Sequence, residues 1–264
     1  MQTVLITGCA NGIGWHLAQC FYEKCYFVVA TDVDLEKLQS QTKHWDNSKS
    51  LVVGLDVRQA NGWKTLANTL PQIDILINNA GVIVPSFLAE MNTESIDFQI
   101  DINQKGMMYG TVIVGQKMIK QGHGHIINVA SLAGIAPIHG LGIYAASKHG
   151  IRAFTLSIAH EMKQKGIVVS CICPDLVATD MLTLQLDYEA AALTFSGNKN
   201  LTVNDIEKAV FERALVKKEL EICIPRHRAW LGKIANLFPA SNAWLVDRLS
   251  TKGRQNQARF KADK

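Results

Sequence analysis

The sequence predicts an α/β fold in which one doubly wound parallel sheet carries helices on both faces. Short runs of Val, Ile and Leu alternate with segments whose apolar residues recur at the 3.6-residue period of a helix. The short runs are almost continuously apolar, which is typical of strands buried on both faces. Strands that alternate with helices pair in parallel through right-handed crossovers, and their helices then cover both faces of the sheet.

The elements follow this pattern from the N-terminus. The first expected strand is Thr3–Thr7, and a helix over residues 11–24 connects it to a second strand, Phe27–Thr31. Further strands are expected within residues 51–57, 73–81, 124–131 and 166–174, each followed by a segment with helical periodicity. The alternation weakens after Pro174. Because no repeat, low-complexity segment or Pro/Gly-rich linker interrupts the chain, we expect residues 1–264 to form a single domain.

Composition narrows the class of protein. The chain is 48% hydrophobic and 19% charged, as in ordinary globular proteins and unlike disordered ones. No stretch reaches the roughly 18 apolar residues of a membrane-spanning helix, and the first residues do not have the pattern of a signal peptide. We therefore expect a cytoplasmic protein.

The cysteines point to core packing. None of the six belongs to a C-x-x-C pair, and most lie inside apolar runs. This pattern predicts buried free thiols, with no disulfide framework and no metal site. Cys171 and Cys173 would fall on one side of a strand.

A glycine-rich turn, TGCANGIG, joins the first strand to the first helix at residues 7–14. Its glycines permit a tight turn, let backbone N–H groups approach a pyrophosphate, and leave that anion at a helix N-terminus. Such a turn alone can be only a turn. Strand, glycine turn, helix, strand and the acidic Asp32 together predict a Rossmann-type dinucleotide site.

Asp32 bears on the choice of cofactor. At the end of the second strand its carboxylate can accept hydrogen bonds from the adenosine ribose, although it can instead cap the next helix. A carboxylate there repels a 2′-phosphate, and neither residues 9–11 nor the residues after Asp32 offer a nearby Arg or Lys to neutralise one. NAD is therefore the predicted cofactor.

Tyr144 and Lys148 stand four residues apart in YAASK, a stretch that reads as helix, so both side chains point the same way. Alone, this spacing can be an exposed pair without function. Oxidising an alcohol, however, requires a base for the hydroxyl proton while a hydride leaves for the nicotinamide. A free tyrosine titrates near about 10. We expect the Lys148 ammonium and the positive nicotinamide ring to lower the pKa of Tyr144.

These motifs, in this order, resemble the classical short-chain dehydrogenase/reductase family. The resemblance runs from the glycine loop to about Met181, so residues 1–181 would be the cofactor and catalytic core. Residues 182–264 would be a substrate lid and C-terminal extension of the same domain. The resemblance implies that the cofactor is bound by Gly8, Asn11, Gly12, Ile13, Gly14, Asp32, Asp56, Val57, Asn79, Ala80, Gly81, Tyr144, Lys148, Pro174, Val177 and Thr179.

The resemblance also implies a catalytic set of Asn103, Ser131, Tyr144 and Lys148. Tyr144 would be the general acid/base, and Ser131 would hold the substrate oxygen. Lys148 would bind the nicotinamide ribose, and Asn103 would hold a water that connects the lysine to solvent. The simpler interpretations are that Ser131 caps a strand end and that Asn103 satisfies a helix kink.

The segment CPDLVATDM departs from the family pattern, because Asp175 follows Pro174 where a glycine is usual. The added negative charge could alter the backbone geometry after Pro174 and the choice of substrate. The next stretch, residues 182–200, is rich in Leu, Ala and aromatic residues. As a lid it would suit a hydrophobic alcohol or ketone, and the alternative is that these side chains pack on the body of the protein.

The C-terminal region is basic, with 12 Lys/Arg against 4 Asp/Glu from Arg213 to Lys264. It loosely resembles family members that handle retinoids, steroids and long-chain lipids. Residues 226–238 alternate basic and bulky apolar side chains and could touch an anionic membrane surface, although such a segment more often covers an active site or a subunit contact. We expect no nucleic-acid partner, because no reading motif accompanies the basic residues.

The leading functional hypothesis is an NAD-dependent dehydrogenase of a hydrophobic secondary alcohol, or a reductase of the matching ketone. The alternative is a non-catalytic NAD-binding sensor or scaffold, which the intact catalytic set disfavours. A sugar-nucleotide epimerase or dehydratase of the related extended type is disfavoured by the glycine spacing. In this family, long helices beginning near Asp101 and Leu141 commonly form subunit contacts, so a homodimer or homotetramer is expected.

Overall fold

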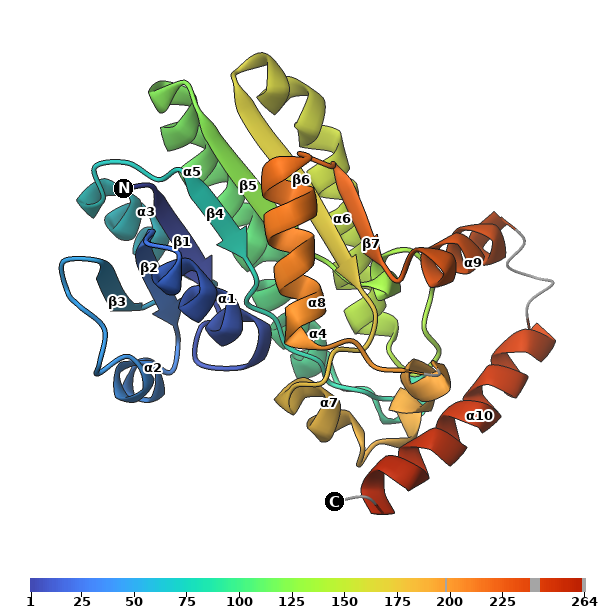
Figure 1. Cartoon of the computed structure of the whole chain (residues 1–264). Helices are drawn as coiled ribbons and strands as arrows, with labels where there is room; N and C mark the ends of the chain where they lie inside the picture. The colour runs from blue at the N-terminus through green and yellow to red at the C-terminus, as the bar shows by residue number, and fades with distance from the viewer. Residues whose placement is uncertain (198, 238–242, 263–264) are drawn as a thin grey trace.

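A seven-stranded parallel sheet forms the centre of the molecule (Figure 1). The computed structural model describes residues 1–197, 199–237 and 243–262, without the side chains of residues 243–245. The strands lie in the order β3-β2-β1-β4-β5-β6-β7. Their bounds are β1 Thr3–Thr7, β2 Phe27–Asp32, β3 Ser50–Gly54, β4 Ile75–Asn78, β5 Gly124–Val129, β6 Ile167–Pro174 and β7 Glu221–Ile224. The predicted fold class is confirmed.

Helices cover both faces of this sheet (Figure 1). Those of the first half of the chain are α1 Gly12–Glu23, α2 Leu35–Gln41, α3 Ala60–Thr69, α4 Thr93–Gln99 and α5 Gly106–Gln121. Those of the second half are α6 Gly142–Gln164, α7 Asp180–Gln185, α8 Val203–Lys208, α9 Arg226–Leu237 and α10 Ala243–Ala262. Short 3-10 turns are η1 Leu88–Glu90, η3 Leu132–Gly134 and η4 Glu189–Ser196, and π-helical segments are η2 Ile100–Lys105 and η5 Ala209–Val216.

Alternate side chains of each central strand enter two different cores, which explains the continuous apolar runs. In β1, Val4 and Ile6 pack in the layer of α1, α2 and η5, whereas Leu5 packs in the layer of α3, α5 and α6. All three are fully buried. Neither side of the strand tolerates a polar side chain, because both sides are covered.

The direction in which successive strands are added to the sheet reverses between β1 and β4, which pair with each other in parallel. β2 and β3 lie on one side of this point, and β5, β6 and β7 lie on the other. At such a switch point the loops after adjacent strands turn to opposite faces and leave a crevice at the carboxyl ends. The glycine turn after β1 and the segment NNAG, residues 78–81 at the end of β4, therefore meet there.

The region after β6 contains a strand that the sequence pattern did not predict. β7 is only four residues long, and it pairs in parallel with β6 from Cys171↔Glu221 to Pro174↔Ile224. α10 lies outside the sheet and packs along η4, the second part of the predicted lid (Figure 1). The weak alternation after Pro174 thus reflects a layer of helices added over the catalytic face.

Five of the six cysteines are buried and all six are free, in agreement with the prediction of core thiols. Cys25 is the exception: it is exposed in the turn after α1, with a left-handed φ of 61°. Within the described residues, no helix combines the length and the apolarity needed to cross a bilayer.

Candidate active site

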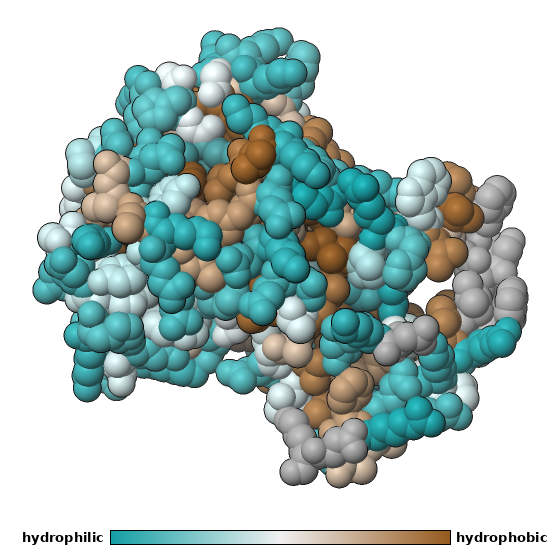
Figure 2. Space-filling model, viewed as in Figure 1, coloured by the Kyte–Doolittle hydropathy of each residue, from teal (hydrophilic) through white to brown (hydrophobic). Residues whose placement is uncertain are grey.

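A cavity of about 1460 Å³ opens at the carboxyl ends of the strands. Figure 2 shows hydrophobic side chains gathered in the hollow between the sheet and the C-terminal helices. Two predicted site residues, Gly14 and Asn103, lie outside the lining. The predicted residues that line it are Gly8, Asn11, Gly12, Ile13, Asp32, Asp56, Val57, Asn79, Ala80, Gly81, Ser131, Tyr144, Lys148, Pro174, Val177 and Thr179.

The glycine turn approaches its neighbours more closely than any side chain allows. A Cβ on Gly14 would lie 1.9 Å from the carbonyl oxygen of Gly8. Gly12 has a left-handed φ of 52°, and a Cβ there would lie 3.1 Å from the Thr179 methyl group. The turn therefore presents bare backbone to the cavity at the start of α1, which fits the pyrophosphate of a dinucleotide.

Thr7 fastens the NNAG segment to the glycine turn. Its hydroxyl oxygen accepts hydrogen bonds from the backbone N–H groups of Asn79 and Ala80, each at 3.0 Å. The Asn79 amide in turn donates to the Thr7 carbonyl oxygen at 2.9 Å. Sequence reasoning did not single out Thr7, and the available signal was a hydroxyl residue at the carboxyl end of β1.

Asn78 links β4 to the rest of the sheet through buried polar side chains. Its amide donates to Thr111 Oγ1 at 3.0 Å and to Asn128 Oδ1 at 2.8 Å. The Asn128 amide donates to Thr155 Oγ1 on α6 at 3.0 Å. These bonds connect β4 to β5, α5 and α6 and pair buried amide and hydroxyl groups, although Asn78 Oδ1 itself has no hydrogen-bond partner.

Asp32 grips the glycine turn from the end of β2. Its carboxylate accepts from the N–H of Ala10 at 2.8 Å and from the N–H of Asp34 at 3.0 Å. The cap of α2 is Asp34, which accepts from the N–H of Lys37 at 3.1 Å. The alternative interpretation of Asp32 as the helix cap is therefore wrong.

The expectation that no basic residue lies near the turn is also wrong. The Lys37 ammonium donates a hydrogen bond to Asn11 Oδ1. The first turn of α2 brings Lys37 back over the glycine turn, although four residues separate it from Asp32. A positively charged side chain is therefore hydrogen-bonded to Asn11, which lines the cavity.

Asp56 and Val57 lie in the loop after β3 and line the cavity. Arg58 donates from Nε and Nη2 to the Asp56 carboxylate at 2.7 to 3.1 Å. These hydrogen bonds hold the pKa of Asp56 below its usual range. Asp56 therefore faces the cavity as a paired carboxylate at neutral pH.

Ser131, Tyr144 and Lys148 come together at the end of β5 and the start of α6. Tyr144 and Lys148 share one helical face as predicted, with Lys148 Nζ 5.6 Å from the Tyr144 ring centroid. Lys148 donates to the Val129 carbonyl oxygen at 3.0 Å. Ser131 accepts from the N–H of Ala133 at 3.1 Å, so it also caps the 3-10 turn η3, whereas its simpler interpretation was a cap of the strand end.

The pKa of Tyr144 differs from the sequence-based expectation. Burial raises it to about 12, and a hydrogen bond with Ser131 only partly opposes this rise. The same burial lowers the pKa of Lys148 to about 8. Burial disfavours the charged form of both groups, so the lysine alone does not produce a tyrosinate.

Asn103 lies in the π-helical segment η2 and is fully buried. Its side chain accepts from the N–H of Val82 at 2.7 Å and donates to the Val82 carbonyl oxygen at 2.9 Å. It also donates to Ser147 Oγ at 3.1 Å. A Cβ on Gly81 would lie 3.3 Å from Asn103 Oδ1 and 3.5 Å from Lys148 Nζ. The side chain thus fixes the loop beside Lys148, and the simpler interpretation of a kinked helix agrees with the π-helix.

Asp175 follows Pro174 and forms an ion pair that the sequence did not reveal. Its Oδ2 lies 3.0 Å from Nε of Arg228, which belongs to α9. Burial raises the pKa of Asp175, and the Arg228 guanidinium opposes the rise. Arg228 also donates to Ser196 Oγ at 3.2 Å. The unusual aspartate is thereby neutralised at the cavity wall.

The lid, residues 182–200, both packs on the body and lines the cavity. Phe195 is 2% exposed and lies 6.1 Å from the Phe260 ring of α10, whereas Leu193 faces the cavity. The Gln257 amide of α10 donates to the carbonyl oxygens of Gln185, Leu186 and Tyr188 at 2.9 to 3.0 Å. The C-terminal helix therefore holds the lid against the catalytic face.

Comparison with known proteins agrees with this geometry. A family model described as short chain dehydrogenase matches residues 2–189. The chain belongs to the short-chain dehydrogenase family. The order of the glycine turn, NNAG, Ser131 and YAASK identifies the classical type of this family, as the resemblance implied. The matched region contains all of the predicted site residues.

Curated relatives cover most of the chain. The NADP-dependent 3-hydroxy acid dehydrogenase YdfG of Salmonella typhi is 33% identical over 229 residues, or 83% of this chain and 91% of the relative. The (S)-acetoin-forming diacetyl reductase of Staphylococcus epidermidis is 30% identical over 187 residues, or 68% of this chain and 73% of the relative.

Solved structures share the fold. The closed form of a serine dehydrogenase complexed with NADP⁺ has a TM-score of 0.77 at 29% identity and covers 84% of this chain and 94% of its own. A short-chain dehydrogenase/reductase from Burkholderia phymatum in complex with NAD has a TM-score of 0.79 at 23% identity, with coverage of 89% and 93%. This dehydrogenase therefore has the fold of proteins that bind either nicotinamide dinucleotide.

Proposed function

We propose that this dehydrogenase catalyses reversible hydride transfer between NAD(H) and a hydrophobic secondary alcohol or ketone, with Tyr144 as general acid/base. The observation that carries the proposal is the position of Tyr144 in the wall of a largely apolar cavity, between Ser131 and Lys148. Tyr144 is the titratable hydroxyl among these three side chains, and a reacting oxygen needs such a group beside it.

The side chains divide the work. When bound, the oxidised dinucleotide supplies a hydride acceptor and a positive charge. Ser131 holds the substrate oxygen by donating a hydrogen bond, which orients the reacting carbon. Tyr144 exchanges its phenolic proton with that oxygen. Lys148, held by the Val129 carbonyl oxygen, places a cation 5.6 Å from the Tyr144 ring centroid, and together with the positive nicotinamide ring it favours the phenolate.

The preference for NAD rests on Asp32. Its carboxylate is fixed by the N–H groups of Ala10 and Asp34 at the end of β2, and Asp32 lines the cavity. A carboxylate at this end of β2 would repel the 2′-phosphate of NADP. Both groups are negatively charged, so they repel each other at short range.

Two observations count against this preference. The Lys37 ammonium, which is hydrogen-bonded to Asn11, weakens the repulsion of a 2′-phosphate. The YdfG relatives are also named as NADP-dependent. Asp32 itself lines the cavity whereas Lys37 does not, so we favour NAD.

The hydrophobic substrate rests on the lid and α9. Leu182 and Leu193 of the lid face the cavity together with Leu231 and Ile234 of α9. Burial of apolar substrate surface against apolar walls of this kind makes substrate binding more favourable. The Arg228 guanidinium also lines the cavity, but it is paired with Asp175.

A hydroxy acid is the second candidate, because Arg228 could bind a carboxylate by exchanging Asp175 for it. This candidate also matches what the name of the YdfG relatives says of those proteins. The non-catalytic sensor or scaffold remains the alternative outside catalysis, and retention of Ser131, Tyr144 and Lys148 in one cavity argues against it.

The test is the initial rate of nicotinamide reduction with a panel of secondary alcohols, from short to steroid-sized, together with 3-hydroxy acids. NAD and NADP are compared in parallel, with Tyr144→Phe and Asp32→Ala as variants. We expect turnover of bulky apolar alcohols with NAD, loss of at least about a thousandfold in kcat in Tyr144→Phe, and a shift towards NADP in Asp32→Ala.

Three outcomes would contradict parts of the proposal. Exclusive turnover of 3-hydroxy acids would overturn the hydrophobic substrate, and a preference of the wild type for NADP would overturn the role of Asp32. Tight dinucleotide binding without turnover of any alcohol or matching ketone would support the sensor.

A further inference from the structure

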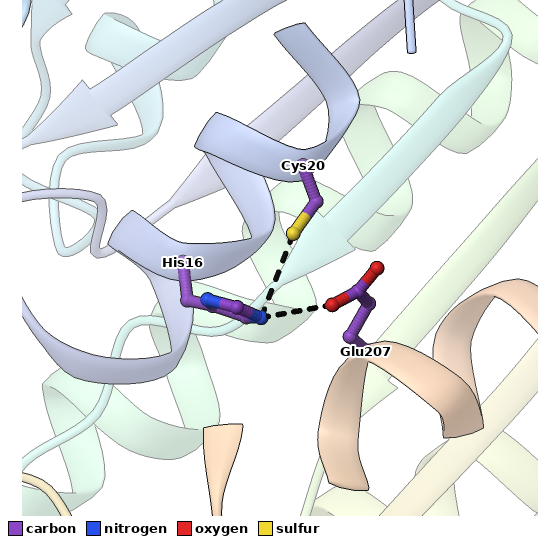
Figure 3. Close-up of side chains that lie close together, drawn as sticks. All are labelled: His16, Cys20 and Glu207. Carbon is purple, nitrogen blue, oxygen red and sulfur yellow. Dashed lines mark hydrogen bonds and ion pairs between the residues drawn. The ribbon is translucent and has the colours of Figure 1, made fainter. Parts of the chain in front are cut away.

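Three potential metal ligands converge between α1 and α8, outside the active site (Figure 3). His16 and Cys20 are four residues apart on α1, so their side chains project from one helical face. Glu207 projects towards them from α8. None of the three lines the catalytic cavity.

The distances suit a tetrahedral ion. His16 Nε2 lies 3.5 Å from Cys20 Sγ and 3.1 Å from Glu207 Oε2, and the three ligand atoms all lie within 4.8 Å of one another. Zinc bonds of about 2.0 to 2.3 Å place tetrahedral ligand atoms about 3.3 to 3.6 Å apart. Small side-chain movements are enough to reach that geometry.

Glu207 can accept hydrogen bonds from both His16 and Cys20, and these bonds hold the three groups together without an ion. A single Nε2 atom can donate a proton to Glu207 or accept one from Cys20, but it cannot do both at once. A cation can be shared by the lone pairs of all three atoms. A thiolate and a carboxylate also balance the charge of a divalent ion, and the imidazole adds none.

The surroundings meet the other requirements of a metal site. Cys20 is 6% exposed, whereas the side chains of His16 and Glu207 are 22% and 27% exposed, which leaves an entry path and room for a water as fourth ligand. Lys24 lies 3.4 Å from the second carboxylate oxygen of Glu207 and orients it so that Oε2 faces the cluster.

We propose that His16, Cys20 and Glu207 form a site for Zn²⁺ or a similar borderline divalent cation that links α1 to α8. Sulfur and imidazole ligands select such ions over Mg²⁺ and Ca²⁺. The sequence-based expectation of no metal site rested on the lack of C-x-x-C pairs. That criterion does not detect a histidine and a cysteine that lie one helical turn apart. Binding displaces the thiol proton into the buffer.

The site joins a helix that begins at the glycine turn to one that continues into η5. An ion that binds the folded chain and has little affinity for the unfolded chain raises the stability of the folded state. Because the cluster lies outside the cavity, the ion would stabilise this interface without entering the reaction.

The test is a Co²⁺ titration of the chelator-treated full chain in a phosphine reductant, followed by thiolate-to-metal charge transfer in the near-ultraviolet. We expect one Co²⁺ per chain, displacement by Zn²⁺, and a rise of a few °C in the Tm with excess Zn²⁺. Cys20→Ser should abolish the band. Cys25→Ser, which removes the exposed cysteine just after the same helix, should retain it.

Glu207→Gln keeps the shape of a partly exposed side chain, so it serves as a second variant if Cys20→Ser does not fold. We expect it to weaken Co²⁺ binding by at least about tenfold. The proposal is overturned if the wild type shows no thiolate–metal band, if the band persists in folded Cys20→Ser, or if Glu207→Gln binds Co²⁺ as tightly as the wild type.

Discussion

Arg228 of α9 pairs with Asp175 after β6, with 3.0 Å between Nε and Oδ2. The side chains are 27% and 14% exposed, so the pair is largely shielded from water. Because Arg228 also bonds Ser196 of the lid, one guanidinium joins the segment after β6, the lid and α9. The charge of Asp175 at a position where the family usually has glycine thus has a structural explanation: it anchors the C-terminal region over the active site.

The strength of this anchor can be measured with a double-mutant cycle. Asp175→Asn and Arg228→Gln each leave a partly buried charge without its partner, so each should lower the free energy of unfolding by about 1 to 2 kcal/mol. In the double variant neither charge remains, and the loss should be smaller than the sum of the two. Urea denaturation of the four proteins gives the coupling energy. Purely additive losses would show that the two residues do not interact.

The first six strands could be predicted from the sequence because their physical cause is local. A strand buried on both faces must be apolar at every position, as Val4, Leu5 and Ile6 show. β7 was not predicted because its four residues, Glu221–Ile224, are too few to show a pattern that separates a strand from a loop. Its place is decided by pairing with β6 over residues far away in the sequence.

The candidate site divides in the same way. Tyr144 and Lys148 were predictable because helix geometry fixes residues four apart on one face. The pairs Asp175 with Arg228 and Asn11 with Lys37 were not, because their partners are brought together by the packing of α9 and α2. The rise in the pKa of Tyr144 was not predicted for a related reason: burial depends on the whole cavity wall, whereas the expectation considered only the charges of Lys148 and the nicotinamide ring.

Gly14→Ala should disable dinucleotide binding. The added Cβ would lie 1.9 Å from the Gly8 carbonyl oxygen, so the turn must open to accept it. We expect the Kd for NAD to rise by at least about tenfold and the Tm to fall, measured by calorimetry and thermal denaturation. Gly142→Ala is the control, because an added Cβ meets nothing within 4 Å at that helical position. Unchanged NAD affinity in Gly14→Ala would refute the close approach of the turn.

His125 should make the fold sensitive to acid. The Ser170 hydroxyl donates to the Glu219 carbonyl oxygen at 2.7 Å, so His125 Nε2, 2.9 Å away, must donate to Ser170 Oγ as a neutral ring. Burial, helped by the Lys218 charge, lowers the pKa of His125 from 6.5 to about 4.

In the window between these two pKa values the unfolded chain binds a proton that the folded chain does not, so stability falls as the pH falls from 6.5 to 4. The full shift corresponds to about 3 kcal/mol. Relative to wild type, His125→Gln should lose less stability on acidification, as followed by urea denaturation at a series of pH values. His160→Gln, which changes an exposed histidine, should behave like wild type. Equal acid sensitivity of wild type and His125→Gln would contradict the assignment.

Gln257 should control the mobility of the lid. Its buried amide nitrogen donates to the carbonyl oxygens of Gln185, Leu186 and Tyr188, all at the end of α7 or in the turn that follows it. Gln257→Leu keeps the apolar stem but removes all three hydrogen bonds, and the carbonyl oxygens of Gln185 and Tyr188 keep only their backbone partners, the N–H groups of Tyr188 and Ala191. This loss should cost about 1 to 3 kcal/mol. The loosened lid should exchange amide hydrogens faster over residues 182–196, while β1 and β4 keep their protection.

The kinetic consequence distinguishes a lid from a merely packed segment. If the lid closes over substrate, Gln257→Leu should raise KM for a bulky alcohol several-fold and leave the Kd for NAD unchanged, because the glycine turn and Asp32 lie away from α10. Gln255→Ala is the matched control, since it removes an exposed amide from the same helix. Faster exchange over residues 182–196 with an unchanged KM would mean that the segment packs on the body without covering the substrate.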